Sequence, residues 1–231
     1  MQLFYQPELI NGVNTLDSEE SRHAIKVLRK KEGDAIDLVD GHGKFYTAEI
    51  RKADFRKCEF EIVSTKEEPK RNGFRHLAIA PTKNLDRTEW LVEKAVEMGV
   101  DRISFVLCQN SERTVLKTER LVKKAVSAMK QSLKATLPQI DELMKLKQFI
   151  SSCETAEKFI AYVDFENPVH LKDCIKTEQH SVVLIGPEGD FDPSELDLAI
   201  ENGFQKVSLG ESRLRTETAG LAAVHLLNLF S

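Results

Sequence analysis

The first third of the chain alternates apolar and polar residues in short runs. Residues 35–39 and 45–50 alternate on either side of a glycine-rich turn at 41–43, and residues 58–63 alternate again. A period of two predicts strands that bury one face, and the tight turn predicts that the first two form a hairpin. Several short strands joined by tight turns predict a small β barrel.

A change of rhythm follows the charged segment 66–73, which carries both Pro and Gly and has the composition of a linker. Beyond it, short apolar runs alternate with amphipathic segments, which predicts an α/β domain with a mostly parallel sheet. The predicted strands are 76–81, 102–107, 159–163, 182–185 and 206–209, and the main predicted helices are 86–98 and 118–133. We therefore expect two domains, 1–70 and 71–231.

Capping boxes, in which an Asp is followed three residues later by a Glu, predict where several helices begin. They are Asp17 with Glu20, Asp86 with Glu89, and Asp192 with Glu195, the last with Pro193 at the first helical position. The first of these helices is expected to run to about Arg29, and a last helix is expected to begin near Thr216.

Composition adds little to this picture. The 231 residues are 41% apolar and 30% charged, and 37 acidic against 33 basic residues give a net charge of −4. That charge argues weakly against a nucleic-acid binder, although the local distribution of charge decides where an anion docks. No apolar run is long enough to cross a membrane, and no signal peptide is expected. Four widely spaced cysteines predict reduced thiols in a cytoplasmic protein.

Two glycine-containing loops are the main candidates for chemistry. Residues 184–189 and 209–219 each follow an apolar strand and precede a helix. Ligands of parallel α/β sheets bind outside the carboxyl ends of the strands, and glycine lets the backbone approach them closely. One such loop alone is more often a simple turn. Two of them, with Arg215, Thr216 and Glu217 clustered after the second strand, favour a binding site.

The strings Ile-Gly-Pro-Glu-Gly-Asp-Phe at 185–191 and Leu-Arg-Thr-Glu-Thr-Ala at 214–219 resemble the bacterial 16S rRNA uridine-N3 methyltransferases. The resemblance extends over nearly the whole chain, with further matches at 23–34, 87–100 and 111–114. It implies a PUA-like β-barrel domain that binds RNA, followed by an α/β methyltransferase domain of the SPOUT superfamily with a deep trefoil knot. It also implies S-adenosylmethionine as cofactor and 16S rRNA of the 30S subunit as partner.

The resemblance also implies roles for individual residues. The expected cofactor-binding residues are Ile185, Gly186, Pro187, Glu188, Gly189, Leu209, Gly210, Leu214, Arg215, Thr216, Thr218 and Ala219. Arg215 would stabilise the uridine anion, and Glu217 would act as a base, orient Arg215 or cap the helix. The chain departs from the family pattern at Asp190, often a second glycine, and at Ser212-Arg213, often Arg-Ile, which moves an arginine by one position.

A basic helix face is the candidate surface for RNA. Six basic residues and one acidic residue lie between Lys117 and Lys134, and an apolar stripe is expected on the opposite side. Such a face is usually only solvated, but an RNA substrate favours phosphate contacts. The expected RNA-binding residues, which include a second basic cluster in the first domain, are Arg22, Lys26, Arg29, Arg113, Arg120, Lys123, Lys124 and Lys130. The predicted apolar stripe is Val122, Ala125, Val126, Met129 and Leu133.

The last helix, 219–230, is apolar almost all round. That pattern is typical of a core helix, and the resemblance favours a homodimer with this helix near the interface. The six histidines lack metal-binding spacing, so no metal site is expected. Three alternatives stay open: a knotted methyltransferase with another rRNA or tRNA target, a non-catalytic RNA-binding assembly factor, and a Rossmann-like enzyme acting on a small molecule. The missing glycine fingerprint after strand 76–81 counts against the last.

Overall fold

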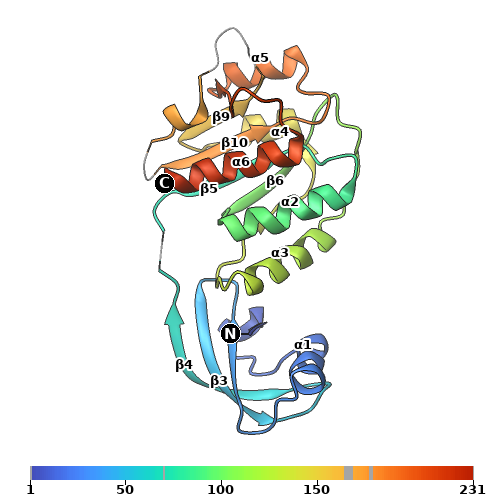
Figure 1. The fold of residues 1–231 in the computed structure, drawn as a ribbon, viewed down its shortest axis with the longest axis vertical. Helices are drawn as coiled ribbons and strands as arrows, with labels where there is room; N and C mark the ends of the chain where they lie inside the picture. Colours follow the sequence, from blue (N-terminus) through green and yellow to red (C-terminus); the bar gives the residue numbers. More distant parts are fainter. Residues whose placement is uncertain (1, 70, 164–168, 177–178, 231) are drawn as a thin grey trace. The chain divides into compact units, whose positions relative to one another are not determined.

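The computed structural model describes residues 2–69, 71–163, 169–176 and 179–230. The chain forms two compact units, drawn in Figure 1. Unit 1 consists of residues 1–70 and 126–137, and unit 2 consists of residues 71–125 and 138–231. No pattern in the sequence predicted that residues 126–137 belong with the N-terminal segment.

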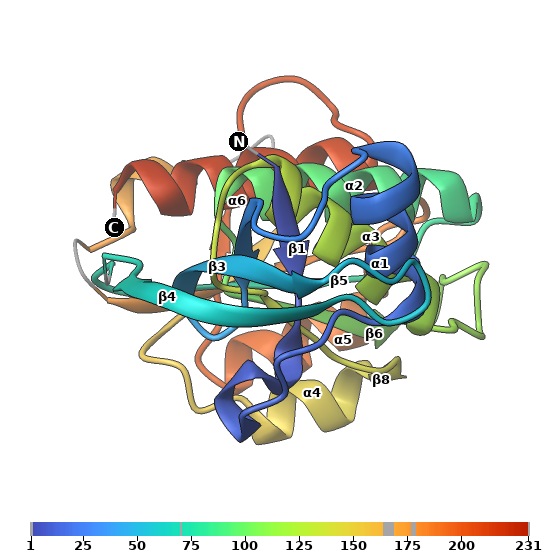
Figure 2. The same ribbon diagram turned by 90° about the horizontal axis from the view of Figure 1, so that it is seen from below.

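Unit 1 is built on a four-stranded sheet in the order β1-β2-β3-β4, in which only the β1–β2 pair is parallel. The strands are β1 (Leu3–Tyr5), β2 (Ala35–Val39), β3 (Lys44–Lys52) and β4 (Glu59–Glu67). Figure 2 shows the two long strands β3 and β4 side by side. The predicted alternation is observed, because Tyr46, Ala48 and Ile50 of β3 are buried in the core of this unit.

The sheet of unit 1 curls partly into the expected barrel. After β1 and the 3-10 turn η1 (Pro7–Asn11), the chain meets the start of β4, where Thr15 bridges Glu59. The Leu16 amide donates to the Cys58 carbonyl at 2.9 Å, and the Phe60 amide donates to the Asn14 carbonyl at 3.1 Å. The residues around Thr15 thus cover the other edge of β4, and η1 separates them from β1.

The first helix is shorter than predicted. Asp17 caps α1 (Ser18–Arg22) by accepting from the Glu20 amide at 2.7 Å, and a π turn, η2 (His23–Val27), ends the helical segment. The expected capping box is not formed, because the Glu20 carboxylate accepts instead from the Tyr5 amide at 3.3 Å and from the Lys130 ammonium at 2.5 Å. Arg29 lies beyond the helix with a φ of 57°, a left-handed conformation that no helix continues.

Unit 2 contains the predicted parallel sheet, in the order β11-β9-β10-β5-β6-β7, with β8 pairing β6 farther along. Every pair in it is parallel. The strands are β5 (Phe74–Ile79), β6 (Arg102–Leu107), β7 (Gln139–Ile140), β8 (Met144–Lys145), β9 (Glu157–Ala161), β10 (His180–Ile185) and β11 (Gln205–Val207). The apolar run 182–185 is fully buried between neighbours on both sides, as a central parallel strand requires.

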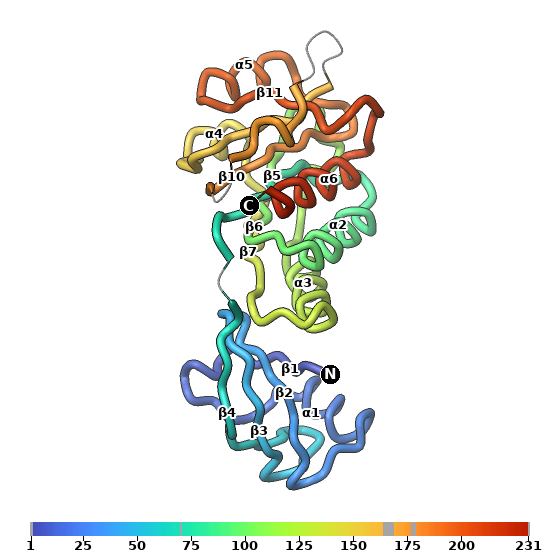
Figure 3. The backbone as a smooth tube through the Cα atoms, turned by 60° about the vertical axis from the view of Figure 1, so that its left-hand side comes forward, coloured from blue at the N-terminus to red at the C-terminus, as the bar shows by residue number. Residues whose placement is uncertain are grey.

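Helices cover both faces of this sheet. Figures 1 and 3 show α2 (Leu85–Met98) and α6 (Thr216–Leu229) on one face, and α4 (Leu146–Ser152) and α5 (Pro193–Glu201) on the other. The helix α6 packs against both α2 and β5, and α4 packs against α5 and β6. A short 3-10 turn, η3 (Leu171–Asp173), also contacts α6. The α/β class with a parallel sheet is therefore confirmed.

Of the capping boxes predicted for α5 and α2, the first is confirmed and the second is wrong. At α5 the capping box is complete, since Asp192 accepts from the Ser194 amide and Glu195 accepts from the Asp192 amide at 3.1 Å. At α2 the prediction is wrong, because Asn84 is the cap and accepts from the Asp86 amide at 3.0 Å. The Glu89 carboxylate pairs instead with the Arg120 guanidinium, at 2.5 Å.

The apolar side of α3 (Glu119–Gln131) differs from the predicted stripe. Leu121, Ala125, Ala128 and Met129 are buried, whereas Val122 and Leu133 are 37% and 46% exposed. The buried side therefore includes Ala125 and Met129 of the predicted stripe, together with Leu121 and Ala128, which were not predicted. In the described parts of the chain, no helix is long and apolar enough to cross a membrane. The threading of the C-terminal segment into a knot stays a prediction.

Candidate functional site

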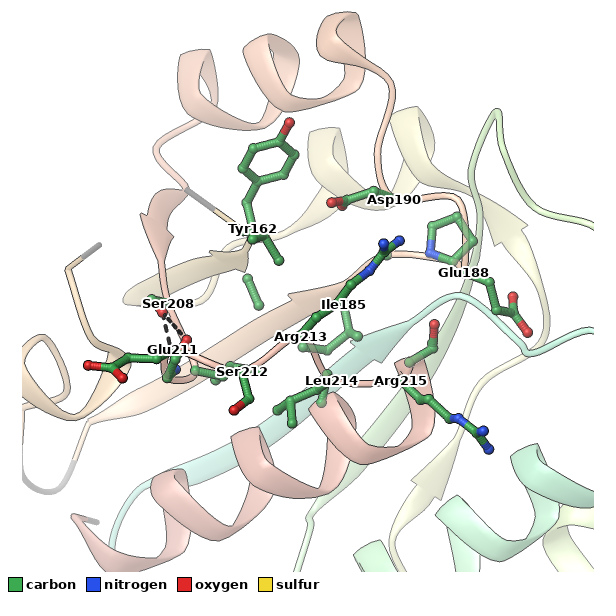
Figure 4. Close-up of a pocket in the computed structure, with 18 of the residues that line it drawn as sticks. Tyr162, Ile185, Glu188, Asp190, Ser208, Glu211, Ser212, Arg213, Leu214 and Arg215 are labelled. Carbon is green, nitrogen blue, oxygen red and sulfur yellow. Dashed lines mark hydrogen bonds between the residues drawn. The ribbon is translucent and has the colours of Figure 1, made fainter. Parts of the chain in front are cut away.

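A cavity of about 780 Å³ lies at the carboxyl ends of β9, β10 and β11 in unit 2. The parallel register of these neighbouring strands brings three loops together there, as the position of ligand sites in α/β sheets predicts. Figure 4 shows the side chains around it. The lining residues are Arg87, Ala161, Tyr162, Val163, His170, 185–188, Asp190, 208–216 and Ala219.

The loop after β10 is fixed by neighbouring segments. Asn110 donates its amide to the Gly189 carbonyl at 3.3 Å and to the Asp190 carbonyl at 3.2 Å. The Glu188 carboxylate accepts from the Lys83 amide at 2.9 Å, so one of its oxygens is used within the protein. A Cβ on Gly186 would lie 3.0 Å from the Phe191 ring, so a side chain at this position would push the ring outward. The result is a preorganised wall for a ligand.

The loop after β11 runs from Ser208 to Arg215 and forms the opposite wall. The Ser208 hydroxyl donates to the Gly210 carbonyl at 3.0 Å, and the Gly210 amide donates to the same hydroxyl oxygen at 3.1 Å. Gly210 has a φ of 128°, a conformation that L side chains rarely adopt. These contacts turn the chain sharply, so that the following residues lie along the cavity before α6 begins.

The first turn of α6 has no side-chain cap. Arg215 is the N-cap residue and makes no capping hydrogen bond, in contrast to Asp192 at α5. The first amides of any helix need acceptors from outside the helix. The Ala219 amide already donates to the Arg215 carbonyl at 2.8 Å, so the free amides of this turn are those that precede Ala219. Thr216 lines the cavity, so a ligand with acceptor oxygens would meet a free helical amide there.

Two arginines enter the cavity from the same loop. Both line the cavity, but in Figure 4 only the side chain of Arg213 points toward the loop that carries Asp190, and that of Arg215 points away from it. Within the described residues, neither guanidinium has a hydrogen bond or ion pair to the protein. Both are therefore available to a ligand or substrate.

Glu217 is buried behind the wall and is not among the lining residues. One of its carboxylate oxygens lies 3.8 Å from Nε of Arg87, which does line the cavity. The other oxygen is buried and has no hydrogen-bond partner in the described part of the chain. The geometry places Glu217 against Arg87 and not against Arg215, which favours a positioning role.

Most of the expected RNA-binding cations of unit 2 and α3 are already paired. Arg113 donates to the carbonyls of Thr82 and Lys83, at 3.0 and 2.5 Å, and so braces the loop beside Glu188. Three cations of α3 face carboxylates, and the pairs are Arg120 with Glu89, Lys124 with Glu93 and Lys130 with Glu20. Lys123 has no such partner among the described residues. The positive charge of this face is largely neutralised.

Of the twelve expected cofactor residues, all but Gly189 and Thr218 line the cavity. Sequence reasoning missed Arg87, Tyr162, His170 and Arg213 as lining residues. The first three come from other elements, and no local pattern marks them. Arg213 stood within the motif, and its departure from the family pattern was the only available signal.

Metal and thiol chemistry find little support in the described residues. There, no three His, Cys, Asp or Glu side chains gather in a way that would hold a metal ion. Burial raises the pKa of the Cys58 thiol to about 11, and burial in the core also raises the pKa of the Cys108 thiol. A buried thiol with a raised pKa is a poor nucleophile.

A parallel α/β unit with a preformed cavity at its strand ends, in one chain with a small β unit, is typical of an enzyme that carries a separate binding module. The family models divide the chain in a similar way, except that residues 126–137 of unit 1 fall within the methyltransferase model. An RNA methyltransferase domain matches residues 69–228, and an RNA methyltransferase PUA domain matches residues 16–63. The chain belongs to this RNA methyltransferase family, as its motifs predicted.

Individual relatives are similar over their full lengths. The chain is 30% identical to ribosomal RNA small subunit methyltransferase E of Aquifex aeolicus, with 100% of both chains covered. Among solved structures, a probable rRNA-methyltransferase from Porphyromonas gingivalis is 43% identical, with 99% of both chains covered and a TM-score of 0.92. A ribosomal RNA small subunit methyltransferase E from Neisseria gonorrhoeae bound to S-adenosylmethionine is 29% identical, with 99% and 97% covered and a TM-score of 0.87.

Proposed function

We propose that this protein transfers a methyl group from S-adenosylmethionine to N3 of a uridine in 16S rRNA of the small ribosomal subunit. The observation that carries the proposal is the cavity at the ends of β9, β10 and β11, in a chain that belongs to an RNA methyltransferase family. The names of full-length relatives, and the S-adenosylmethionine bound to one of them, support the substrate class and the cofactor.

The cavity fits a cofactor of this size and chemistry. Its volume of about 780 Å³ lies within the range of small-molecule sites. The glycines at 186 and 210 allow backbone groups to approach a ligand, and the uncapped first turn of α6 offers amide donors to its oxygens. The two cavity walls, 185–190 and 208–219, would hold the cofactor. When bound, it supplies a methyl group on a sulfonium, whose departure leaves a neutral thioether.

The chain's own task is orientation and control of charge. The reaction forms a bond between uridine N3 and the methyl carbon, breaks the carbon–sulfur bond, and releases the N3 proton. N3 lies on the pairing edge, so the base must be unpaired or flipped out of a helix. Arg215, whose guanidinium is unpaired in the cavity wall, would stabilise the imide anion through its carbonyl oxygens. Glu217 would hold Arg87 in place.

The division of labour follows the two family matches. Residues 1–70 would act as the PUA-like RNA-binding domain, and residues 71–231 as the SPOUT methyltransferase domain. Arg22, Lys26 and Arg29 in the first, with Lys123 in the second, are the proposed phosphate contacts that remain unpaired. We place the reaction in the cytoplasm, where ribosomal subunits assemble.

A homodimer is part of the proposal. The outward side of α6 carries Leu229, which is 61% exposed, and Phe230 follows at 40%. An apolar strip of this kind at the end of a buried helix is suited to a second copy of the chain. Sedimentation would test it, since a monomer at micromolar concentration would contradict this part.

The test of the reaction is transfer of labelled methyl from S-adenosylmethionine to small-subunit particles from cells that lack the enzyme, followed by nucleoside analysis. Label in 3-methyluridine is the expected result. Label in another nucleoside would refute the uridine target but would still support S-adenosylmethionine as the methyl donor. Cofactor binding without transfer to particles, free rRNA or tRNA would refute the catalytic proposal in favour of an assembly factor.

Arg215→Ala should retain cofactor binding and lose most methyl transfer, because the uridine anion needs the guanidinium, whereas the other residues of both cavity walls still hold the cofactor. Removing one group that stabilises developing charge costs roughly 10²- to 10³-fold in rate. Single-turnover transfer and equilibrium cofactor binding are the two measurements. Lys147→Ala, an exposed change on α4, is the control. Wild-type turnover of the Arg215 variant would rule out the role.

A further inference from the structure

An exposed aromatic ring lies at the turn between β3 and β4 in unit 1. Phe55 is 40% exposed, while the core of this unit is formed by other residues. A phenylalanine in a tight turn, outside the core, loses the burial that normally stabilises this residue type. Its ring is therefore open to contact with a partner from outside the chain.

Two cations flank the ring. The Lys26 ammonium lies 4.7 Å from the ring centroid and the Arg56 guanidinium carbon lies 5.4 Å from it. They come from different elements, because Lys26 belongs to η2 and Arg56 follows Phe55 in the turn. Both cations are within the distance at which a ring face attracts a positive charge.

The loop that follows η2 is bound to the same turn. The Glu32 carboxylate accepts from the Ala53 amide at 3.3 Å, and the Gly33 amide donates to the Ile50 carbonyl at 2.9 Å. Residues 26–34 and 50–57 therefore form one continuous surface around Phe55. We call this surface, defined by these two segments, the Phe55 patch.

The Phe55 patch is positively charged although the whole protein is negative. Its three nearby carboxylates, Glu32, Asp34 and Asp54, each accept from a backbone amide and leave the cations unpaired. Among the described residues, these cations have no ion pair: Lys26, Arg29, Lys31, Arg56 and Lys57. Local charge of this sign, on a protein of net charge −4, selects an anionic partner.

We propose that the Phe55 patch binds an unpaired nucleotide of RNA, with its base stacked on Phe55 and its flanking phosphates held by Lys26 and Arg56. The proposal rests on the proposed function for the presence of an RNA substrate, and assigns this chain a nucleotide-binding site in unit 1. Aromatic rings beside cations are the usual platform for single strands, since every base offers a stacking face.

Magnitudes favour the base over the present arrangement. An exposed cation over a ring contributes about a 2- to 5-fold preference, whereas stacking a base on an aromatic side chain contributes about 5- to 150-fold in affinity. A base can therefore displace the Lys26 ammonium from the ring. The ammonium released in this way lies beside the nucleotide and can pair with its phosphate.

The test is binding of a fluorescein-labelled oligouridylate of about ten nucleotides to the full-length protein, followed by anisotropy. Phe55→Leu should weaken binding about 5- to 100-fold, with the salt dependence unchanged because no phosphate contact is lost. Phe55→Trp should bind at least as tightly as the wild type. Lys26→Gln should reduce the salt slope by about 0.7.

Unchanged affinity of Phe55→Leu would overturn the proposal, and so would an equal loss in Phe55→Trp, which would indicate a merely structural role. Weaker binding of Phe55→Leu to phosphatidylglycerol vesicles, with normal RNA binding, would overturn it in favour of a membrane. Equal urea midpoints of the variants exclude misfolding, and Lys26→Gln gives an independent result if Phe55→Leu does not fold. If the protein transfers no methyl group but its RNA binding still depends on Phe55, the proposed reaction is refuted and the nucleotide-binding site is supported.

Discussion

The contact between α6 and the sheet at Gly220 gives a sharp test of the packing. An ideal Cβ on this glycine would lie 2.8 Å from Cδ1 of Ile79 and 3.0 Å from Cδ1 of Leu91. Gly220 is inside a helix and has no positive φ, so a side chain there is opposed by space and not by backbone strain. We predict that Gly220→Ala destabilises the protein.

Two effects of opposite sign set the magnitude. Alanine in place of glycine stabilises a helix interior by about 1 kcal/mol. Forcing an extra methyl into a packed core costs about 1–3 kcal/mol. A carbon–carbon distance of 2.8 Å lies well inside van der Waals contact, so Ile79 has to move. The packing cost should exceed the helix gain, which gives a net loss of up to about 2 kcal/mol.

The double variant isolates the cause. Ile79→Val removes the methyl group nearest to the new Cβ, and alone should cost about 0.5–1.5 kcal/mol. In the double variant the alanine methyl occupies the vacated space, so the two losses should not add. We expect the double variant to be more stable than the sum of the single changes by about 0.5–3 kcal/mol, the range for residues in contact.

Urea unfolding of the four proteins measures this cycle. Asn228→Ala, an exposed change on the same helix, reports the helix propensity gain without a packing cost. The reasoning is refuted if Gly220→Ala is stabilised as much as Asn228→Ala, or if the double variant equals the sum of the single changes. Because the first turn of α6 lines the cavity, cofactor affinity should fall along with stability.

Two further predictions concern hydrogen bonds and protonation. Burial lowers the pKa of His76 from its usual 6.5 to about 4, so the unfolded chain binds a proton that the folded one refuses. The free energy of unfolding should fall by about 3 kcal/mol as the pH drops from about 6.5 to 4, at 1.36 kcal/mol per pKa unit. The variant His76→Gln should lose this part of the pH dependence. Urea unfolding in acid would contradict the prediction if the free energy of unfolding fell equally with pH in both proteins. Asn110→Ala should weaken cofactor binding by about 5- to 30-fold, because two hydrogen bonds to the Gly189–Asp190 turn, each contributing about 1 kcal/mol, are lost. Titration calorimetry would measure the dissociation constant of the cofactor for both proteins. An unchanged dissociation constant would contradict the prediction and show that the turn keeps its shape without Asn110.

The parallel sheet of unit 2 was predictable because its signals are local. The continuous apolar run 182–185 and the mostly apolar run 102–107 are short and alternate with helical segments, which favours buried strands. The cavity walls were predictable for a related reason. Ligand sites in parallel sheets lie at the carboxyl ends of the strands, and glycines mark the loops that follow them. The Asp192 cap of α5 was predictable because its partners lie within three residues of one another.

Other features depend on residues far apart in the sequence. The strands β1, β7 and β8 are two or three residues long and carry too few positions for a period to be read. The cavity residues Arg87 and Tyr162 come from elements whose own patterns say only helix and strand end. Tertiary packing brings these two residues to the site, and no local pattern in the sequence predicts which distant segments meet there.

The two failed capping boxes show which interaction wins when a local and a distant partner compete. Glu20 and Glu89 are almost buried, and each meets a cation of α3, Lys130 and Arg120 respectively. An exposed cap contributes about 1 kcal/mol, whereas leaving a buried carboxylate without its cation costs about 3–5 kcal/mol. The distant pair therefore prevails, and the helices begin with one capping side chain each. The same pairing removes those α3 cations from the pool available to RNA phosphates. Unpaired positive charge then remains on Lys123 and around Phe55, and there we expect substitutions to change the salt dependence of RNA binding most.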